Sequence, residues 1–168
     1  GYWTVENNDR AVMKRPQVDG FSQELFVARE AMEHGYNVSL PYGGAAAYDM
    51  LVERGGKILK TQVKSASMGR RPWVQELTGL RKYEDSEVDF FAGVVDVEGM
   101  KKESEKSLSF SEGRHVFYKE FDPDRGQTAR VNYRQPSDVK YYNRDDFKPA
   151  TDHDFEAKIE PRLGGGDS

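Results

Sequence analysis

The first regular pattern of apolar and polar positions lies between Gly20 and Gly35. Four apolar residues recur there at the spacing of one helix face: Phe21, Leu25, Ala28 and Met32. We therefore predict a helix that Ser22 caps at its start and that ends at Gly35, because glycine readily adopts the left-handed conformation that follows a helix. Residues 1–19 show no clear period and are expected to form an irregular N-terminal arm.

Strand-like patterns dominate the rest of the chain. Short apolar or alternating runs predict strands at residues 37–40, 46–53, 57–66, 88–97, 115–121 and 128–134. Gly55 and Gly56 separate the second and third of these strands, which is typical of a two-residue hairpin turn. Residues 67–79 have the composition of a loop, and residues 74–83 favour a short helix. This order of elements predicts a mixed α/β or α+β domain built on a β-sheet.

One domain accommodates the whole pattern. The chain has 168 residues, of which 36% are hydrophobic and 32% are charged, and this composition suits a single domain with a modest core and a charged surface. We expect the domain to span residues 20–150. Residues 151–168 include three consecutive glycines and are expected to form a mobile tail.

Cysteine content and charge narrow the setting in which the protein works. The chain has no cysteine, which excludes disulfides and thiolate metal sites and favours a reducing cytoplasm. No apolar run approaches the ~20 residues that span a bilayer, and the N-terminus lacks the basic and apolar regions of a secretory signal. The formal net charge of −4 argues against a protein that coats DNA generally, but it leaves room for a local basic surface that faces DNA.

The predicted hairpin brings polar residues together. If the two glycines form the turn, the strand register places Asp49 directly opposite Gln62, with the Cβ atoms roughly 5 Å apart on one face of the sheet. Lys64 shares this face because it lies two residues beyond Gln62. Apolar neighbours are expected around the three side chains: Ala47, Leu51, Ile58 and Ala66.

A fourth polar residue is expected at the same place. Glu24 projects near the apolar stripe of the preceding helix, so it should point toward the hairpin. A carboxylate and an ammonium group among apolar side chains cost several kcal/mol unless they are paired or bound to metal. The structural alternative is a solvated face or a buried ion-pair network that binds no metal.

These residue types suit the hydrolysis of a phosphodiester. Carboxylates, carbonyls and water are the ligands that Mg²⁺ prefers. A bound metal ion polarises the phosphate and helps to deprotonate a water molecule. A nearby lysine can position that water and stabilise the developing negative charge. The sequence contains no phosphate-cradling P-loop, so the use of ATP is not indicated.

Two stretches of the sequence resemble the PD-(D/E)XK nuclease superfamily. The first runs from Gly43 to Ala66 and contains Tyr48-Asp49 and Gln62-Val63-Lys64, and the second is residues 83–92. With the preceding helix, they are most similar to the branch that has glutamine in the signature (QXK). This branch includes group I intron homing endonucleases and is related to archaeal Holliday-junction resolvases. The resemblance covers about residues 20–97.

The resemblance implies a fold and a set of site residues. The implied fold is a restriction-endonuclease-like core, in which a mixed central β-sheet is flanked by helices, within a nuclease domain at residues 20–150. The implied catalytic residues are Glu24, Asp49, Gln62 and Lys64. Asp49, Glu24 and the backbone carbonyl of Val63 would bind Mg²⁺, for which Mn²⁺ substitutes, and Lys64 would serve the nucleophile.

The chain departs from the signature of the superfamily at two positions. Tyr48 replaces the eponymous proline, which is a common change in the superfamily. Gln62 replaces the usual acid, which removes one negative charge and in principle weakens metal binding. The branch with glutamine is nevertheless active, so the resemblance still implies an active site here.

The resemblance also implies an activity and partners. It implies a metal-dependent endonuclease that cuts double-stranded DNA as a homodimer or homotetramer, is encoded by a bacterium, an archaeon or a phage, and has no membrane partner. We take a homing endonuclease as the first interpretation. A Holliday-junction resolvase and a restriction endonuclease remain open, and a non-catalytic DNA-binding module with the nuclease fold is the alternative from another class.

Basic residues outside the four-residue site are candidates for contact with DNA: Arg70, Arg71, Lys82, Arg125, Arg130 and Arg134. The first three follow the site closely in sequence and could contact phosphates. The last three lie on or beside the strands predicted between residues 115 and 134, which we expect to form a two-stranded ribbon that enters a DNA groove. The alternative for each of them is an ordinary charged surface.

Overall fold

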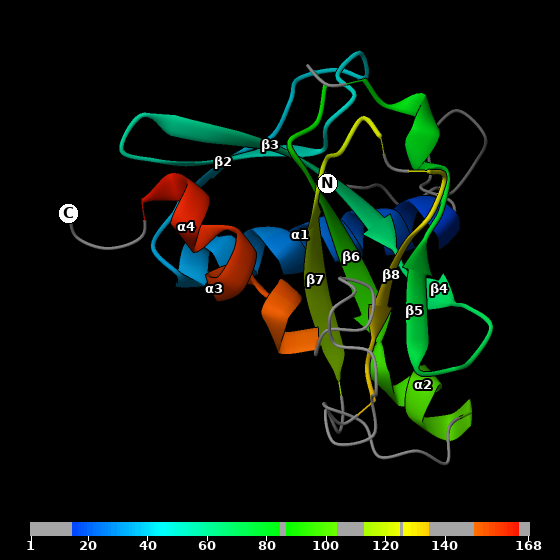
Figure 1. Ribbon diagram of the computed structural model, residues 1–168. Helices are drawn as coiled ribbons and strands as arrows, with labels where there is room; N and C mark the ends of the chain where they lie inside the picture. The colour runs from blue at the N-terminus through cyan, green and yellow to red at the C-terminus, as the bar shows by residue number, and fades with distance from the viewer. Residues whose placement is uncertain (1–14, 85–86, 104–112, 125, 135–149, 165–168) are drawn as a thin grey trace, which may run out of the picture.

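Figure 1 shows the computed structural model, which describes residues 15–84, 87–103, 113–124, 126–134 and 150–164. The helices are α1 (Arg15–Glu33), η1 (Leu80–Lys82), α2 (Val97–Glu103), η4 (Ala150–His153), α3 (Phe155–Lys158) and α4 (Glu160–Leu163). The strands are β1 (Asn37–Ser39), β2 (Met50–Arg54), β3 (Lys57–Ser65), β4 (Ser67–Met68), β5 (Val74–Leu77), β6 (Phe90–Asp96), β7 (Arg114–Glu120) and β8 (Ala129–Asn132).

A five-stranded sheet with the strand order β1-β2-β3-β6-β7 forms the centre of the molecule. Its neighbouring strands are antiparallel except β3 and β6, which are parallel. A smaller antiparallel sheet, β4-β5-β8, lies beside it (Figure 1). The mixed sheet with its flanking helices confirms the fold class that the sequence predicts.

The β2–β3 hairpin forms as predicted. Gly55 and Gly56 have φ angles of 59° and 82°, which is the left-handed conformation that a tight two-residue turn requires at both positions. The register runs from Arg54 opposite Lys57 to Met50 opposite Thr61. However, β2 begins at Met50, so the strand expected from residue 46 is four residues shorter at its start.

Helix α1 differs from the prediction in its start and in its buried face. It begins at Arg15, so residues 15–19 of the expected arm are helical, and Ser22 lies inside the helix instead of capping it. Residues 1–14 lie outside the described part of the chain.

The side of α1 that packs on the sheet carries its smaller apolar residues. Val27, Ala28 and Ala31 are buried, whereas three residues of the predicted stripe are exposed by 37%, 50% and 55%: Phe21, Leu25 and Met32. Both sets have helical spacing, and only the small side chains let the helix approach the sheet closely. Glu24 lies three, four and seven positions before the buried residues, so it shares their face.

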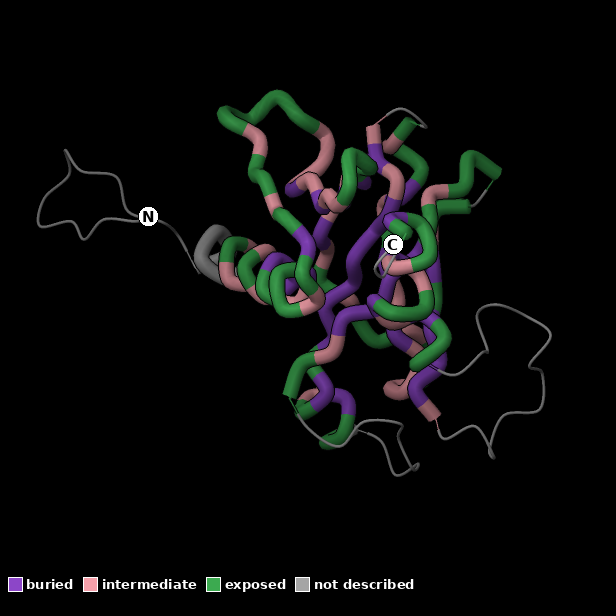
Figure 2. Tube along the Cα trace, turned by 90° about the vertical axis from the view of Figure 1, so that its left-hand side faces the viewer, coloured by how far each residue is buried: buried purple, intermediate pink, exposed green. Residues whose placement is uncertain are grey.

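The two faces of the central sheet carry separate hydrophobic clusters. One cluster joins α1 to alternate residues of the central strands and to Phe155, Ile159 and Leu163 at the C-terminal end. The other joins β5, β8, η1 and α2 to the opposite face. Figure 2 shows the buried residues concentrated along the central strands and the exposed ones on the outer helix and loops.

Most of the C-terminal segment that the sequence predicts to be a mobile tail, residues 151–168, is helical, and residues 165–168 lie outside the described part of the chain. Residues 150–163 form η4, α3 and α4, and Asp154 caps α3 by accepting a hydrogen bond from the Ala157 N–H. Phe155, Ile159 and Leu163 recur every four residues and are 1–3% exposed. Because they bury apolar surface against the sheet, this segment is part of the folded domain.

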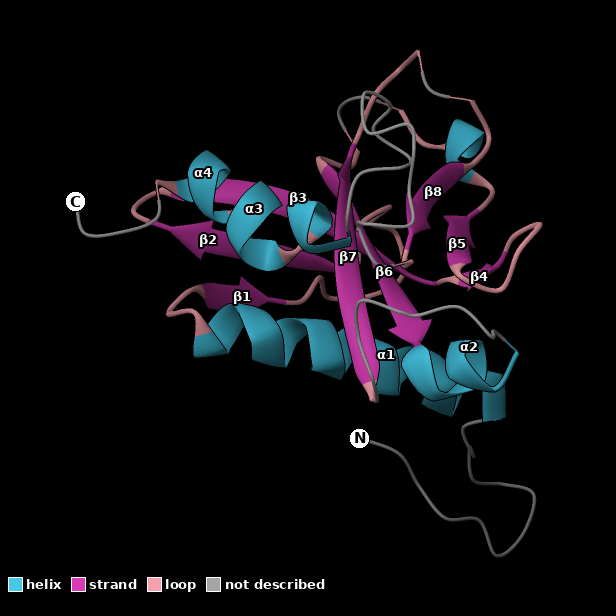
Figure 3. Ribbon diagram, turned by 60° about the horizontal axis from the view of Figure 1, so that its bottom comes forward, coloured by secondary structure: helices cyan, strands magenta, loops and turns pink. Residues whose placement is uncertain are grey.

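Two further predictions are wrong in the second half of the chain. Residues 74–83 form β5 and η1 instead of one helix, because Gln75 and Leu77 alternate into the core at the spacing of a strand. Strands β7 and β8 do not form a hairpin: β7 pairs with β6, and β8 pairs with β5 in the other sheet (Figure 3). In the described residues, no helix is both long and apolar enough to cross a membrane.

Candidate active site

The candidate residues gather where β2 stops beside β3. Strand β2 begins at Met50, opposite Thr61, whereas β3 continues to Ser65. Beyond Thr61, β3 pairs only with β6 among the described strands. This leaves an open edge on the other side of β3, next to the end of β2.

The Asp49 side chain occupies this open edge. The Asp49 N–H donates to the Thr61 carbonyl at 2.9 Å, and the Val63 N–H donates to Oδ2 of Asp49 at 2.8 Å. In a ladder that continued in register, the carbonyl of Tyr48 would accept this second bond. The prediction that Asp49 shares a face with Gln62 is therefore wrong, because its carboxylate turns into the plane of the sheet and takes the place of a backbone acceptor.

The Val63 carbonyl faces the same edge. The N–H and C=O of one strand residue point toward the same neighbouring strand. Because the Val63 N–H reaches Asp49, the Val63 C=O also points to the side where Asp49 lies. One carboxylate and one backbone carbonyl thus share the gap at the end of β2.

Glu24 approaches Asp49 from α1, on one face of the sheet. Burial, and then the negative charge of Asp49, raise the pKa of the Glu24 carboxyl group. The two carboxylates therefore interact electrostatically across the gap between α1 and the start of β2. The helix is held close by Gln23, whose Oε1 accepts a hydrogen bond from the hydroxyl of Ser65 at 2.6 Å.

Gln62 and Lys64 lie on the opposite face of β3. Their neighbours in the register of β6 are Phe91 and Gly93. A side chain at Gly93 would collide with the ring of Phe117, since an added Cβ would lie 2.6 Å from it. Ile58, which was expected to give this face an apolar surrounding, is 50% exposed, so the face is partly open to solvent.

Tyr83 joins Lys64 to a second cation. The Nζ atom of Lys64 lies 5.6 Å from the centroid of the Tyr83 ring, and the Nζ atom of Lys82 lies 5.3 Å from it. Burial, and then the charges of Asp49 and Glu87, raise the pKa of the Tyr83 hydroxyl. The ring therefore contacts two ammonium groups while the residue interacts with Asp49.

The charges of this cluster are only partly compensated. Burial raises the pKa of the Asp49 carboxyl group, although the Val63 N–H and Lys64 favour the carboxylate. Burial and the like charge of Lys82 lower the pKa of Lys64, and Asp49 opposes them. Two neighbouring carboxylates that both resist ionisation form a place where a bound cation would be stabilised.

The oxygen atoms at this edge fit a hard cation. In the part of the chain that the structure describes, no three His, Cys, Asp or Glu residues are grouped as metal ligands. The available donors are the carboxylates of Glu24 and Asp49 and the Val63 carbonyl, and the Gln62 side chain lies on the other face of β3. Mg²⁺ suits such a set because it binds few carboxylates and keeps several of its waters.

The candidate DNA-contact residues are spread over several elements. Arg70 and Arg71 are exposed between β4 and β5, and the Arg71 guanidinium lies 5.9 Å from the centroid of the Trp73 ring. Arg134 lies 5.4 Å from the same ring centroid. Arg130 forms an ion pair with Glu76 at 2.7 Å. Arg125 lies outside the described residues, and the ribbon expected to carry Arg125, Arg130 and Arg134 does not form, because β8 pairs with β5.

The structure adds Tyr83 to the cluster, a residue that the sequence analysis did not include in the candidate site. Its place depends on η1, which turns the chain back toward β3 after β5. Gly79 precedes η1 with a φ of 73°, a left-handed conformation that glycine adopts readily at such a turn. No spacing in the sequence relates Tyr83 to Lys64.

The family model of PD-(D/E)XK endonucleases matches residues 15–139 of the sequence. The match spans most of the chain and includes every residue of the cluster, so the protein belongs to this family of endonucleases. The sequence resemblance to the PD-(D/E)XK superfamily is thereby confirmed.

A solved structure supports the same fold. The chain is similar to the bacterial homing endonuclease I-Ssp6803I, with a TM-score of 0.52 and 18% sequence identity over 73% of this chain and 82% of that one. At this identity the likeness shows the restriction-endonuclease-like fold alone. No curated protein matches the sequence.

Proposed function

We propose that the protein is a metal-dependent endonuclease of double-stranded DNA, with Glu24, Asp49, Gln62 and Lys64 as its catalytic residues. One observation carries the proposal: two carboxylates, a strand carbonyl and a lysine gather where β2 ends beside β3. Membership of the endonuclease family supports DNA as the substrate. The absence of cysteine is consistent with work in a reducing cytoplasm.

Each residue has a role that follows from its position. Glu24, Asp49 and the Val63 carbonyl would hold Mg²⁺ or Mn²⁺, and Gln62 would add a neutral oxygen donor from the other face. When bound, the ion supplies Lewis-acid activation of the phosphate and of a water molecule. The Lys64 ammonium donates hydrogen bonds to the attacking water and to a phosphate oxygen, and so stabilises the charge that develops there. The Val63 N–H fixes the orientation of Asp49.

We favour a homing-endonuclease-like role in which two or more copies act together. The QXK signature and the fold shared with a homing endonuclease support this role. One copy carries one site, and a cut through both strands needs two. Phe21, Leu25 and Met32 give the outer side of α1 an exposed apolar stripe that a second copy could cover.

A cleavage assay tests the proposal. Purified protein is incubated with supercoiled plasmid, a four-way junction and genomic DNA, each with Mg²⁺, with Mn²⁺ and with EDTA. We expect metal-dependent cutting that falls about 10²–10³-fold in Lys64→Ala, as is usual when one group that stabilises the transition state is lost. Lys102→Ala, a change of an exposed lysine on α2, is the matched control and should leave the rate unchanged.

The same experiment separates the competing roles. Preference for the four-way junction would favour a resolvase, and a unique long site in genomic DNA would favour a homing enzyme. Absence of cutting on every substrate, together with no binding of Mg²⁺ by calorimetry, would refute the endonuclease proposal and leave a non-catalytic module.

A further inference from the structure

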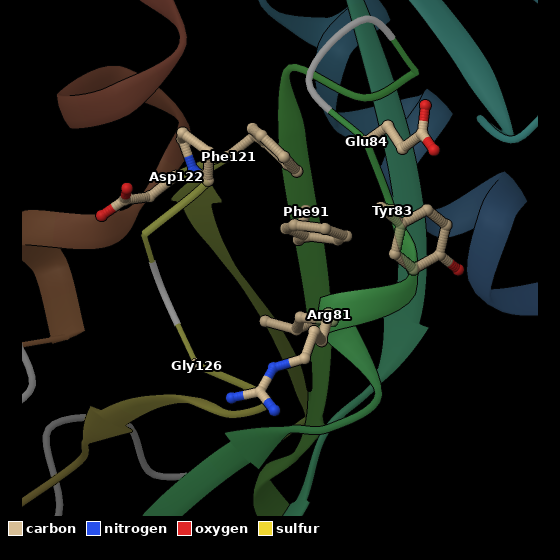
Figure 4. A pocket seen from close by; sticks show the side chains of 9 residues that line it. Arg81, Tyr83, Glu84, Phe91, Phe121, Asp122 and Gly126 are labelled. Carbon is tan, nitrogen blue, oxygen red and sulfur yellow. The ribbon is translucent and has the colours of Figure 1, made fainter.

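Figure 4 shows a pocket of about 240 Å³ whose lining includes Tyr83, the residue that contacts Lys64. The residues that define it come from η1 and the segment after it, from β6 and from the end of β7: Arg81, Tyr83, Glu84, Phe91, Phe121 and Asp122. It opens on the sheet face that carries Gln62 and Lys64, because Phe91 is the direct neighbour of Gln62 in the β3–β6 register.

Three aromatic rings line the pocket. The centroid of the Phe91 ring lies 5.3 Å from that of Tyr83, with the planes at 68°, and 6.4 Å from that of Phe121, with the planes at 35°. In Figure 4 the Phe91 ring lies between the other two, and the carboxylates of Glu84 and Asp122 point away from the rings. The lining therefore offers ring surfaces together with polar groups, among them the Arg81 side chain.

Hydrogen bonds hold the walls of the pocket in place. The Leu80 N–H donates to the Gln127 carbonyl at 3.1 Å, and the Arg81 N–H donates to the Gln127 side chain at 3.3 Å. The Phe121 N–H donates to the Asp89 carbonyl at 2.8 Å. The pocket is thus formed by the fold itself, and a ligand would not have to order its walls.

Tyr83 belongs to both the pocket and the candidate active site. Its ring lines the pocket and is in contact with the ammonium groups of Lys64 and Lys82. A phosphate bound by these two lysines would place the attached nucleotide at the mouth of the pocket. The Arg81 side chain at the rim could contact the next phosphate of the same strand.

We propose that this pocket receives one unstacked nucleobase of the DNA beside the cleavage site, a proposal that rests on the proposed nuclease function. Drug-sized ligands occupy pockets of ~300–1,000 Å³, so a cavity of about 240 Å³ suits a smaller flat group. Enzymes that extrude a base hold it against aromatic and apolar side chains. Stacking on aromatic rings tolerates any base that can leave the stack, and a mismatched or unpaired base leaves it at the lowest cost.

Binding measurements in EDTA test the pocket without cleavage. Fluorescence anisotropy compares three duplexes of one sequence: fully paired, with one unpaired base, and with an abasic site at that position. We expect the wild type to bind the unpaired-base duplex between about 5-fold and 150-fold more tightly than the abasic one, which corresponds to one stacked base. The abasic duplex controls for the flexibility that any defect gives to DNA.

Two variants show whether the pocket causes this preference. Phe121→Leu keeps an apolar side chain but removes the ring, and it should lose most of the preference for the unpaired base while keeping its affinity for paired DNA. Tyr42→Leu makes a comparable change at a fully exposed ring outside the pocket and should keep the preference. Thermal unfolding of each variant checks the fold, and Phe121→Tyr, which keeps a ring, should rescue the preference.

The results distinguish failure of the pocket from failure of the nuclease. Equal binding of unpaired-base and abasic duplexes, or a preference that survives in Phe121→Leu, would overturn the pocket proposal even if plasmid is cut. A preference that depends on Phe121 without any metal-dependent cutting would support the pocket and refute the nuclease. Binding of free dAMP, but not of deoxyribose 5-phosphate, with no effect of Phe121→Leu on DNA, would assign the pocket to a free nucleotide and overturn its assignment to DNA.

Discussion

Lys82 is the residue whose removal tests the electrostatics of the site most directly. In the variant Lys82→Met, the methylene stem is largely kept but the positive charge is lost. The pKa of Lys64 is lowered by burial and by Lys82, so removal of Lys82 must raise it. Lys64 acts as an ammonium group in our proposal. The variant should therefore stay active to a higher pH than the wild type.

The structure sets the size of this effect. Both Nζ atoms lie within 5.6 Å of one ring centroid, so they are no more than about 11 Å apart. At that separation two unit charges repel by about 0.4 kcal/mol at the dielectric constant of water and by about 1.5 kcal/mol at an effective value near 20. These energies change the protonation equilibrium of Lys64 by about 2-fold to 13-fold. Lys64 is partly exposed, so solvent screening favours the lower end of the range.

The assay is the initial rate of plasmid nicking from neutral to alkaline pH, for the wild type, Lys82→Met and the control Lys102→Met. The alkaline limb of the pH profile should move upward in Lys82→Met alone. The displacement should shrink as salt is added, because the Debye length at 0.1 M salt is about 10 Å, close to the separation of the two charges. An alkaline limb that stays in place at low salt, or that moves downward, would refute the assigned interaction or the role of Lys64.

Three other changes test the site, the core and the assembly. Asp49→Asn should abolish cutting and Mg²⁺ binding by calorimetry. In EDTA and above acid pH, the variant should melt at a temperature no lower than the wild type. The pKa of Asp49 is raised, so its ionised form lowers the stability of the folded protein. The amide oxygen of asparagine can still accept the hydrogen bond from the Val63 N–H. Tyr118→Phe removes the 2.7 Å hydrogen bond to Glu30 and should lower the melting temperature by about 3–12 °C, from about 1.5–3 kcal/mol for a bond to a charged group. Burial raises the pKa of Glu30, and the hydrogen bond from Tyr118 lowers it. The fall in melting temperature of Tyr118→Phe should therefore be complete above the pKa of Glu30 and should fade as acid protonates Glu30. A fall in melting temperature that does not depend on pH would contradict the assignment of this hydrogen bond. Leu25→Lys should reduce the mass of the assembly in light scattering, and an unchanged mass would exclude the outer side of α1 as the contact between copies.

The sequence predicted the hairpin because its determinants are local. Two glycines in the left-handed conformation fix the turn, and the turn fixes the register as far as Met50 and Thr61. The buried strand β6 was also predicted, since its run of apolar residues is continuous. Residues that are adjacent in the sequence determine both features, so both can be predicted without knowing the tertiary structure.

Long-range pairing limited the prediction elsewhere. Nothing in the residues of β8 indicates that its partner is β5 rather than the preceding strand β7. Helix α1 has two possible apolar stripes, and the sheet selects the one with Val27, Ala28 and Ala31. These choices depend on the space between elements, which the spacing of residues along one element does not give.

The membership of the candidate site stays a prediction, and its geometry differs from the expectation at Asp49. The charge of Asp49 raises the pKa of Glu24 and opposes the lowering of the pKa of Lys64, so the three groups interact electrostatically. The manner of approach differs from the expectation, because Asp49 leaves the strand and bonds to the Val63 N–H. Side chains alternate between the two faces of a sheet only where the residues belong to a paired strand. Asp49 precedes the first residue of β2, so this alternation does not fix the direction of its side chain.

The burial of the C-terminal segment has a consequence for the synthesis of the protein. The candidate catalytic residues lie within the first half of the chain, but the cluster that supports α1 and the sheet includes Phe155, Ile159 and Leu163. A nascent chain that has emerged only as far as β7 would present uncovered apolar surface on that side of the sheet. We therefore expect the domain to complete its folding only after Leu163 has emerged from the ribosome.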